Sequence, residues 1–483
     1  MHRLPALCIL AGSILSAQAE VTLSPVIGSH MVLQRDSACP IWGWADAGED
    51  VTVEFAGQKL TAKPDAQGKW QVSLKPMKAN ATSQTMTIRG KNEIKLDDIL
   101  IGEVWLCSGQ SNMEWTVSGS ANAKEEIAAA NDARIRHIKV NNQPAKTPDA
   151  KVVSTNGWQV TSPETVGGFT AVGYFFARDL AKELNVPVGL LGANWGGTRI
   201  EPWTPPVGFK QVPALSKITE KLDTYPETEE KPDKTDPTKM VTQVKLQSPT
   251  ALFNGRIAPL VPFAIRGALW YQGEGNNGEG MQYFEKMKAL IGGWRSVWKM
   301  PEMPFYFVQL APFIYNGSNP ENLARIWESQ AASLQIPHTG MAVTTDVGNP
   351  TDIHPKNKQE VGRRLSLWAL AKTYGKKDVV FSGPIFKGVK YEGDKAVVSF
   401  EHTAGGLQSR NSNPLTHFLI AGEDKAFVPA KAEIVGETVV VSAENVSKPI
   451  GVRYAWSHDA EPNLANKAGL PASPFRTDDW PLP

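Results

Sequence analysis

The chain runs from an apolar segment, Ile99–Leu106, directly into the octapeptide Leu106-Cys107-Ser108-Gly109-Gln110-Ser111-Asn112-Met113. The segment has the composition of a buried strand, and the octapeptide then places one serine between two amide side chains. Gly109 permits a tight turn, because glycine adopts backbone conformations that other residues avoid. Such a turn presents the Ser111 hydroxyl at the end of a sheet with backbone N–H groups beside it, a geometry that suits nucleophilic attack on an ester carbonyl.

From about residue 99 to 375, expected strands alternate with expected helices, which is typical of a parallel sheet covered by helices. We expect strands at Ile99–Leu106, Val186–Leu191, Ile265–Tyr271, Phe305–Leu310 and Met341–Thr345, and helices at Ala171–Leu184, Met281–Val297, Glu321–Leu334 and Pro355–Tyr374. Catalytic loops in such folds lie at the carboxyl ends of the strands. Ser111, the Gly196-Gly197 turn, Gln272 and His354 each follow one of these ends, so we group them at one site.

Segments with a β pattern flank this region on both sides. Apolar and polar side chains alternate in Val51–Phe55 and Trp70–Leu74, and again in Ala396–Phe400 and Thr438–Val441. We therefore expect an N-terminal β-sandwich at 20–98, an α/β catalytic domain at 99–376 and a C-terminal β-rich domain at 377–483. The stretch 205–249 is rich in Lys, Glu, Asp, Thr and Pro, and is expected to be a surface insertion.

The N-terminus has the pattern of an export signal. A basic start, Met1-His2-Arg3, precedes the apolar run Ala6–Leu15 and the A-x-A pattern of Ser16–Ala19. We expect residues 1–19 to be a signal peptide cleaved after Ala19, and the protein to be secreted or periplasmic. The apolar run is too short to span a bilayer, and no other run of about 20 apolar residues occurs.

Composition narrows the classes of partner and cofactor. The 483 residues carry a formal net charge of +1 at pH 7, which does not favour nucleic acid or an anionic membrane surface. No H-E-x-x-H or C-x-x-C pattern is present, so no metal or other cofactor is expected. Cleavage of the signal leaves Cys39 and Cys107, which are expected to be two inert core thiols.

The segment Asp352-Ile353-His354-Pro355 supplies the expected general base, His354. Proline fits the first turn of a helix and gives the residue before it an extended backbone, so His354 is expected at a loop-to-helix junction facing a cleft. Asp352 or Asp346 is expected to accept the Nδ1–H of the imidazole and fix its tautomer. Considered alone, His354 could also be a capping residue and Ser111 a polar turn residue.

Two further glycine-containing runs, Gly192–Thr198 and Trp270–Asn276, follow expected strands. Glycines let a backbone approach a ligand closely, and an amide side chain can donate to an oxyanion; losing one such donor typically lowers a rate by about 10²–10³-fold. We expect the residues around these runs to contact the substrate, namely Gln110, Asn112, Arg199, Glu201, Trp203, Glu274 and Asn276. Arg199 either meets a substrate carboxylate or pairs internally with Glu201.

Taken together, four blocks of the sequence resemble the sialate O-acetylesterase family, a branch of the SGNH-type hydrolases. They are Gly109–Met113, Gly196–Trp203, Trp270–Glu274 and Asp352–Pro355, and the stretch Gly469–Arg476 is also similar. The resemblance covers nearly the whole mature chain. It implies a three-layer α/β/α, flavodoxin-like catalytic domain with flanking β-sandwich-like domains, and metal-free hydrolysis of O-acetyl esters on sugars.

Carried over position by position, the resemblance implies that Ser111 is the nucleophile and His354 the base. It also implies an oxyanion hole made by the Ser111 amide, a glycine of the Gly196-Gly197 pair and the Gln272 side chain. One position departs from the pattern: SGNH-type enzymes commonly place the acid three residues before the histidine, where this chain has Thr351. We therefore prefer Asp352 as the acid, with Asp346 as runner-up.

The expected function is that of an exported serine esterase that removes O-acetyl groups from sugars. O-acetylated sialic acid is the preferred substrate, and acetylated xylan or another plant polysaccharide is the alternative. A non-catalytic carbohydrate-binding protein on a hydrolase scaffold is an alternative of another class, disfavoured because both Ser111 and His354 are present. The expected partner is the acetylated carbohydrate, without nucleic acid and without a membrane segment once the signal is removed.

Overall fold

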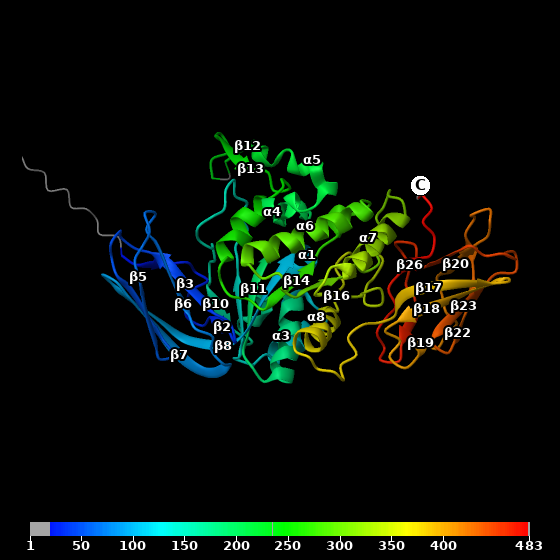
Figure 1. The fold of residues 1–483 in the computed structure, drawn as a ribbon, viewed down its shortest axis with the longest axis horizontal. Coiled ribbons are helices and arrows are strands. Elements are labelled where there is room, and N and C mark those ends of the chain that lie inside the picture. Colours follow the sequence, from blue (N-terminus) through cyan, green and yellow to red (C-terminus); the bar gives the residue numbers. More distant parts are fainter. Residues whose placement is uncertain (1–19, 234, 482–483) are drawn as a thin grey trace, which may run out of the picture.

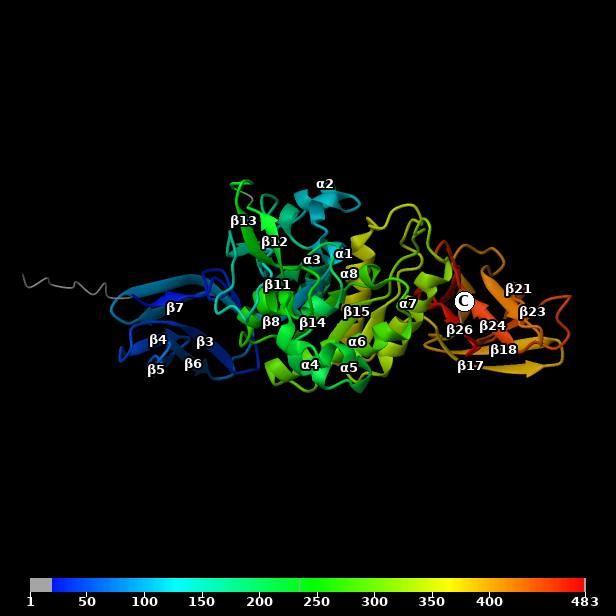
Figure 2. The ribbon, with the colours of Figure 1, turned by 90° about the horizontal axis from the view of Figure 1, so that it is seen from above.

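The computed structural model of the chain describes residues 20–233 and 235–481, so the expected signal peptide, residues 1–19, lies outside the described residues. Three parts lie in a row: an N-terminal β part, a central α/β part and a C-terminal β part (Figure 1). The same order is seen from above (Figure 2), where the helices gather in the central part and the strands of the two ends flank it.

The central sheet has the order β10-β9-β11-β8-β14-β15-β16, in which only the edge strand β10 is antiparallel to its neighbour. The strands span β8 Glu93–Gly109, β9 Ile135–Lys139, β10 Trp158–Val160, β11 Val188–Asn194, β14 Gly267–Tyr271, β15 Phe305–Val308 and β16 Thr339–Ala342. The order of the chain reverses at β8, since β11 lies on one side of it and β14 on the other. In doubly wound sheets such a switch point opens the crevice that binds ligands, and Ser111 follows β8 directly.

Helices cover both faces of this sheet (Figure 1). One face carries α3 (Ala171–Leu184) and α8 (Lys358–Trp368), and the other carries α4 (Pro206–Lys210), α6 (Met281–Trp298) and α7 (Glu321–Ala332). Because both faces are covered, the strands are buried along their length and read as nearly continuous apolar runs. The predicted three-layer α/β/α class is therefore confirmed.

Strand β8 belongs to two parts of the molecule at once. Its first half pairs with β7 (Asn80–Arg89) and β2 (Val32–Gln34), and its second half forms the centre of the α/β sheet. The strands β4 (Val51–Phe55) and β5 (Gln58–Ala62) extend the first half, while β1 (Thr22–Leu23), β3 (Cys39–Trp44) and β6 (Lys69–Leu74) form a separate three-stranded sheet. The expected boundary between residues 98 and 99 thus falls inside one continuous strand.

In its described residues, 205–233 and 235–249, the insertion expected at 205–249 packs on α6. It contains α4, α5 (Ser216–Thr219) and a hairpin of β12 (Thr228–Pro232) and β13 (Met240–Val244). Its apolar side chains form a small core with the α6 residue Ala289, consisting of Phe209, Val212 and Leu215. This small core anchors the described part of the stretch on α6.

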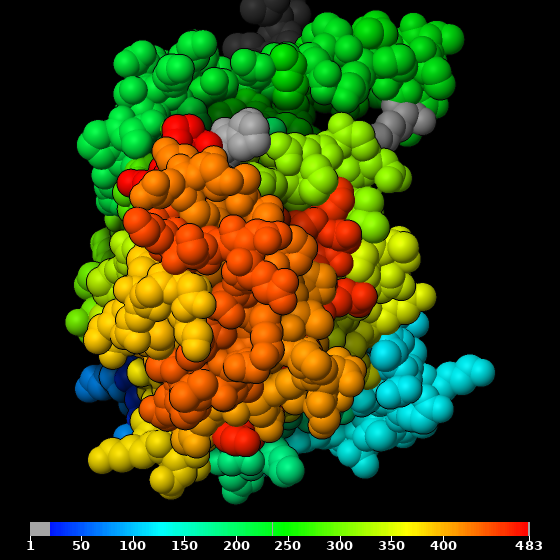
Figure 3. Space-filling model, turned by 90° about the vertical axis from the view of Figure 1, so that its right-hand side faces the viewer, coloured from blue at the N-terminus to red at the C-terminus, as the bar shows by residue number. Residues whose placement is uncertain are grey.

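The C-terminal part has two four-stranded sheets with a core of their own. One sheet contains β17 (Ile385–Glu392), β18 (Lys395–Glu401), β23 (Thr438–Ser442) and β22 (Lys431–Val435); the other contains β21 (Val428–Pro429), β20 (Phe418–Ala421), β24 (Gly451–Tyr454) and β26 (Phe475–Arg476). These strands, golden yellow to red, form the end of the molecule seen in Figure 3. Ion pairs Arg453–Glu321 (3.1 Å) and Arg476–Glu328 (2.8 Å) attach them to α7.

Two further expectations concern the thiols and the membrane. Cys39 and Cys107 are both free and buried, as predicted, and burial raises the pKa of Cys39 to about 12. Neither thiol is therefore ionised to a useful extent near neutral pH. Of the helices in the described ranges, none is both long and apolar enough to cross a bilayer.

Candidate active site

Ser111 begins a short helix, α1 (Ser111–Glu114), immediately after β8. The turn requires glycine at position 109, where φ is +133° and a Cβ atom would overlap the carbonyl oxygen of Tyr271 at the end of β14. Backbone hydrogen bonds join the neighbouring strand ends here: Gln110 N–H donates to Tyr271 O (3.0 Å) and Trp195 N–H donates to Gly109 O (3.0 Å). The ends of β8, β11 and β14 therefore meet around the Ser111 hydroxyl.

His354 lies against this hydroxyl. Its Nε2 atom is 2.9 Å from Ser111 Oγ, and its ring stacks on Trp115, with centroids 5.0 Å apart and planes at 22°. Burial, together with the nearby Lys358, lowers the pKa of His354. A neutral imidazole at hydrogen-bonding distance from a hydroxyl can accept its proton, so the pair has the geometry of a base and a nucleophile.

The two candidate acids occupy different places. Asp352 Oδ1 accepts the backbone N–H of His354 (2.9 Å), and its negative charge acts to raise the pKa of His354. Asp346 faces away, with both carboxylate oxygens on Arg364 (2.6 and 2.7 Å). In the part of the chain that the structure describes, His354 Nδ1 forms no hydrogen bond with the carboxylate of Asp352 or of Asp346. Asp352 is therefore the candidate that acts on His354, through its hydrogen bond to the backbone N–H and through the effect of its charge on the imidazole.

Thr351 occupies the position three residues before His354, where the resemblance described above would place the acid, and it forms hydrogen bonds within the loop instead. Its backbone N–H and its hydroxyl both donate to Asn349 Oδ1, at 2.9 and 2.8 Å. Asp352 N–H donates to the Asn349 carbonyl (2.8 Å), which closes the same turn. This turn fixes the backbone just before His354.

The expected oxyanion hole is only partly available. Gly196 N–H donates to Glu114 Oε2 (2.7 Å), so that amide is occupied although Gly196 lies beside Ser111. Gly197 has φ +70° and open space where a side chain would stand. In the described chain no hydrogen bond occupies the N–H of Gly197 or that of Ser111 at the start of α1. These two amides are the donors that could face an oxyanion.

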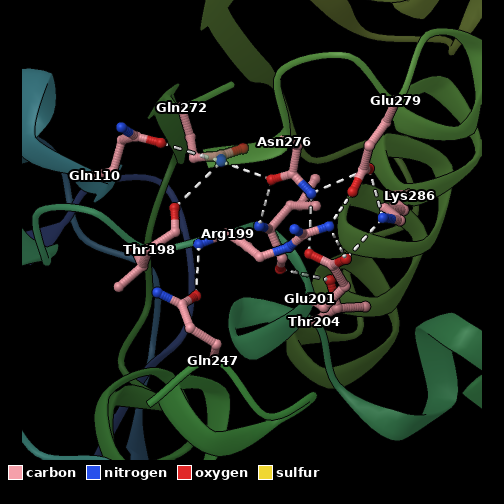
Figure 4. A network of polar contacts seen from close by, with 11 residues as sticks. Gln110, Thr198, Arg199, Glu201, Thr204, Gln247, Gln272, Asn276, Glu279 and Lys286 are labelled. Atoms are coloured by element: carbon pink, nitrogen blue, oxygen red, sulfur yellow. Dashed lines mark hydrogen bonds and ion pairs between the residues drawn. The ribbon is translucent and has the colours of Figure 1, made fainter. Parts of the chain in front are cut away.

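Gln272 differs from its expected role. The side chain is fully buried, and its amide donates to Gln110 Oε1 (3.1 Å), Asn276 Oδ1 (2.8 Å) and Thr198 O (3.2 Å), as Figure 4 shows. Its oxygen accepts the Tyr283 hydroxyl (2.9 Å). Every polar atom of this side chain is engaged within the protein, so it supports the site from behind and does not donate into it.

Arg199 forms the internal ion pair with Glu201 that was one of its two expected roles. Its guanidinium pairs with Glu279 and with Glu201 (3.3 Å), and Lys286 binds the same two carboxylates, with Nζ 2.6 Å from Glu201 Oε1 (Figure 4). Asn276 donates to both carboxylates as well. Two cations and two anions thus neutralise each other, while the Arg199 side chain remains 40% exposed.

Trp203 is also a structural residue. It is fully buried, its indole N–H donates to Thr198 Oγ1 (3.0 Å), and its ring lies edge-on to Trp270. Of the residues expected to contact the sugar, Glu201, Trp203 and Asn276 therefore belong to the packing beneath the site. Gln110 and Asn112, whose side chains flank Ser111 in sequence, are buried too.

A shallow cleft of about 410 Å³ opens in front of the serine. It is lined by Ser111, Glu114, Trp115, Thr116, Ser118, Gly119 and His354. A second hollow of about 500 Å³ lies between α7, α8 and the C-terminal strands, and neither Ser111 nor His354 lines it. We place the chemistry in the smaller cleft, because it alone holds the paired hydroxyl and imidazole.

Sequence reasoning missed Glu114, Trp115 and Lys358. Trp115 stands four residues after Ser111 and Lys358 four residues after His354. Helical spacing could have pointed to Trp115, which directly follows α1, but residues 354–357 precede α8, so the same spacing does not explain the position of Lys358. Over the described ranges, no group of three or more His, Cys, Asp or Glu side chains is placed to hold a metal ion.

Comparisons with known proteins show the family of the chain. Residues 101–370 match the family described as "Carbohydrate esterase, sialic acid-specific acetylesterase". Sialate O-acetylesterase from Mus musculus is 29% identical over 93% of this chain and 92% of its own length, and that from Homo sapiens is 28% identical over 93% and 91%. The crystal structure of a carbohydrate acetylesterase from Xanthomonas citri superposes with a TM-score of 0.85, at 38% identity over 95% of this chain and all of that one. The chain is a carboxylic ester hydrolase that belongs to the sialic acid-specific acetylesterase family of carbohydrate esterases.

Proposed function

We propose that this enzyme removes O-acetyl groups from sugars through an acetyl-enzyme intermediate on Ser111. The observation that carries the proposal is the 2.9 Å contact between Ser111 Oγ and His354 Nε2 at the carboxyl end of the central strand. Activity toward O-acetyl esters of sugars follows from the family, while the serine mechanism is our inference from this contact.

In the first half-reaction His354 Nε2 takes the proton of Ser111 as Oγ attacks the acetyl carbonyl carbon. The carbonyl oxygen becomes an oxyanion, and the N–H groups of Ser111 and Gly197 stabilise it by hydrogen bonds. The bond between the carbonyl carbon and the sugar oxygen then breaks. His354 returns its proton to that oxygen, so the sugar leaves as an alcohol and the acetyl group remains on Ser111.

In the second half-reaction a water molecule takes the place of the sugar. His354 accepts a proton from the water, whose oxygen attacks the acetyl carbon and forms a second oxyanion in the same position. Collapse breaks the ester bond to Ser111, and the proton on His354 passes to Oγ. The products are acetate and the free enzyme, and the Trp115 ring keeps the imidazole in place throughout.

Two classes of sugar remain as substrates. The names of the relatives support an O-acetylated sialic acid. Neutral acetylated polysaccharides such as xylan are the second candidate, and one observation favours them: Arg199, the expected partner of a sialic acid carboxylate, is held by Glu201 and Glu279. Acetate release from matched panels of acetylated sialosides and xylo-oligosaccharides separates the two.

The serine mechanism is tested with Ser111→Ala. Removing the nucleophile of a serine hydrolase lowers kcat by about 10⁴–10⁶-fold, so we expect hydrolysis of a simple acetyl ester such as p-nitrophenyl acetate to fall close to background. Unfolding midpoints of the variant and the wild type should agree, because only one oxygen atom is lost. Equal rates of the two proteins would reject the serine mechanism and leave a carbohydrate-binding role open.

We further propose that the enzyme acts outside the cytoplasm, in the periplasm or the medium. The support is the export pattern of residues 1–19 alone. N-terminal sequencing of protein collected from those compartments should find Glu20 as the first residue. Mature protein that still begins at Met1 would contradict the proposal.

A further inference from the structure

We propose that Lys358, Asn112 and Glu274 form a clamp beneath the surface that holds the Ser111 and His354 loops together. In this clamp the ammonium group of Lys358 keeps His354 in the neutral, basic form. Lys358 is thus assigned as a positioning residue for ester hydrolysis. The inference deepens the proposed serine mechanism and rests on it. None of the three side chains lines the cleft, so none is assigned contact with the substrate.

Asn112 is the centre of the clamp. Its amide nitrogen donates to Glu274 Oε1 (2.6 Å) and to the carbonyl oxygen of Ile353 (3.0 Å), the residue just before His354. Its amide oxygen accepts a hydrogen bond from Lys358 Nζ. One buried side chain next to the nucleophile therefore ties α1 to the loop of the base, to the start of α8 and to the loop after β14.

Lys358 is fully buried, with 0% of its surface exposed. Its ammonium lies 5.2 Å from the Tyr271 ring centroid and 5.9 Å from that of Trp115, the ring that stacks on His354. Burial lowers the pKa of Lys358 to about 7, while Glu274 and Asp352 act to raise it. A lysine so buried is costly for the fold, and placing one beside a catalytic pair is typical of a functional constraint.

Two charged groups act on the pKa of His354, and a third lies in the same cleft. Burial lowers the pKa of His354 most, Lys358 at the start of α8 lowers it further, and Asp352 in the preceding loop raises it. Glu114 on α1 lines the same cleft as His354. Glu274, beyond Asn112, is half-buried as a residue, its Oε2 atom is buried, and burial raises the pKa of its carboxyl group. Because Lys358 is protonated below pH 7, its charge is present where His354 titrates and opposes formation of the imidazolium.

The sign of the expected effect follows from this arrangement. In a pH profile of kcat/KM, the value falls at low pH because His354 becomes protonated. The midpoint of this fall, called the acid limb below, reports the pKa of His354 in the free enzyme. Removing the Lys358 charge removes a repulsion against the imidazolium. The pKa of His354 then rises, and the acid limb moves to higher pH.

The test compares Lys358→Met, which removes both the charge and the hydrogen bond, with Lys358→Gln, which keeps a donor for Asn112 but no charge. We expect the acid limb to move to higher pH in both variants. We expect kcat to fall by about 10²-fold in Lys358→Met, since small misplacements of reacting groups have effects of this size, and less in Lys358→Gln. KM should change little, because the side chain lies outside the cleft.

Lys286→Met is the matched control, since Lys286 is another buried lysine and its partners are Glu201 and Glu279 (Figure 4). It should lower the unfolding midpoint without moving the acid limb. The inference is rejected if the acid limb of both Lys358 variants coincides with that of the wild type. It is also rejected if Lys286→Met moves the acid limb equally, because the clamp then has no role of its own in setting the charge of His354. Failure of the serine mechanism is seen separately, as full activity of Ser111→Ala.

Discussion

Ser111 and His354 lie 243 positions apart in sequence, yet each could be singled out because each follows the end of an expected strand. Parallel strands bring their carboxyl ends to one edge, so position along the chain was enough to predict that the two would meet. The direction of a side chain is a different matter. Gln272 also follows a strand end, but it turns into the buried network because Gln110, Thr198 and Asn276 offer it partners there.

The same distinction applies to Arg199. Sequence shows a cation near an acidic residue, and both a substrate carboxylate and Glu201 could be its partner. Glu279, 80 positions away, completes the internal pairing, and its proximity depends on how α6 packs beside the loop after β11. Such long-range pairing of charges is set by tertiary structure and leaves no local pattern in the sequence.

The open choice between Asp352 and Asp346 gives a prediction at the scale of single residues. Asp352→Asn keeps an acceptor for the backbone N–H of His354 but removes a charge that raises the pKa of its ring. We expect kcat to fall by about 10²-fold or less, short of the roughly 10⁴-fold loss seen where the acid holds the tautomer directly. The acid limb should move to lower pH, opposite to the Lys358 variants, and pH profiles of kcat/KM measure both shifts.

Asp346→Asn should act on stability instead. It removes one of the two anionic partners of the Arg364 guanidinium, which is 4% exposed, and leaves Glu360 (2.8 Å) as the other. Breaking a buried pair completely typically lowers the free energy of unfolding by about 3–5 kcal/mol, so we expect a smaller loss here. Urea unfolding would measure this loss, and kcat of the folded fraction should stay near that of the wild type. A large loss of kcat in Asp346→Asn, with an unchanged midpoint, would reverse the assignment of the acid.

At the scale of elements, strongly periodic segments were predicted well and their ends less well. Helix α3 spans the predicted Ala171–Leu184, and α6 exceeds its prediction by one residue, ending at Trp298. Helix α8 begins at Lys358 and not at Pro355, because Asn357 caps it by accepting the N–H of Glu360. The intervening residues are the loop that carries His354, so this local cap decides where the base stands.

Strand β8 shows why the domain boundary could not be found from pattern alone. Its first half alternates in burial, as expected of a strand with one face exposed, and its second half is buried on both sides. Periodicity detects the change at about residue 99 but cannot say whether the chain breaks there. The strand continues, so the N-terminal β part and the switch point that carries Ser111 share one backbone.

At the scale of the whole molecule, the C-terminal part contributes to the central core although it has a core of its own. Trp456, which is 4% exposed, packs in the central cluster, and the guanidinium groups of Arg453 and Arg476 lie 5.5 Å from its ring. Ser473 reaches Gln309 at the end of β15 (2.9 Å). These contacts indicate that the two parts stabilise each other.

Trp456→Ala tests this dependence. Removing a buried tryptophan typically lowers the free energy of unfolding by about 3–5 kcal/mol, because apolar burial is lost and a cavity remains. We expect the esterase activity, which resides in the central part, to be lost at a lower urea concentration than in the wild type, together with the circular dichroism signal. Trp480→Ala is the control, since that ring is partly exposed and contacts Phe427 within the C-terminal part. If both variants lose activity at the wild-type urea concentration, the central part is stable without its C-terminal neighbour, and the contact at Trp456 does not couple the two.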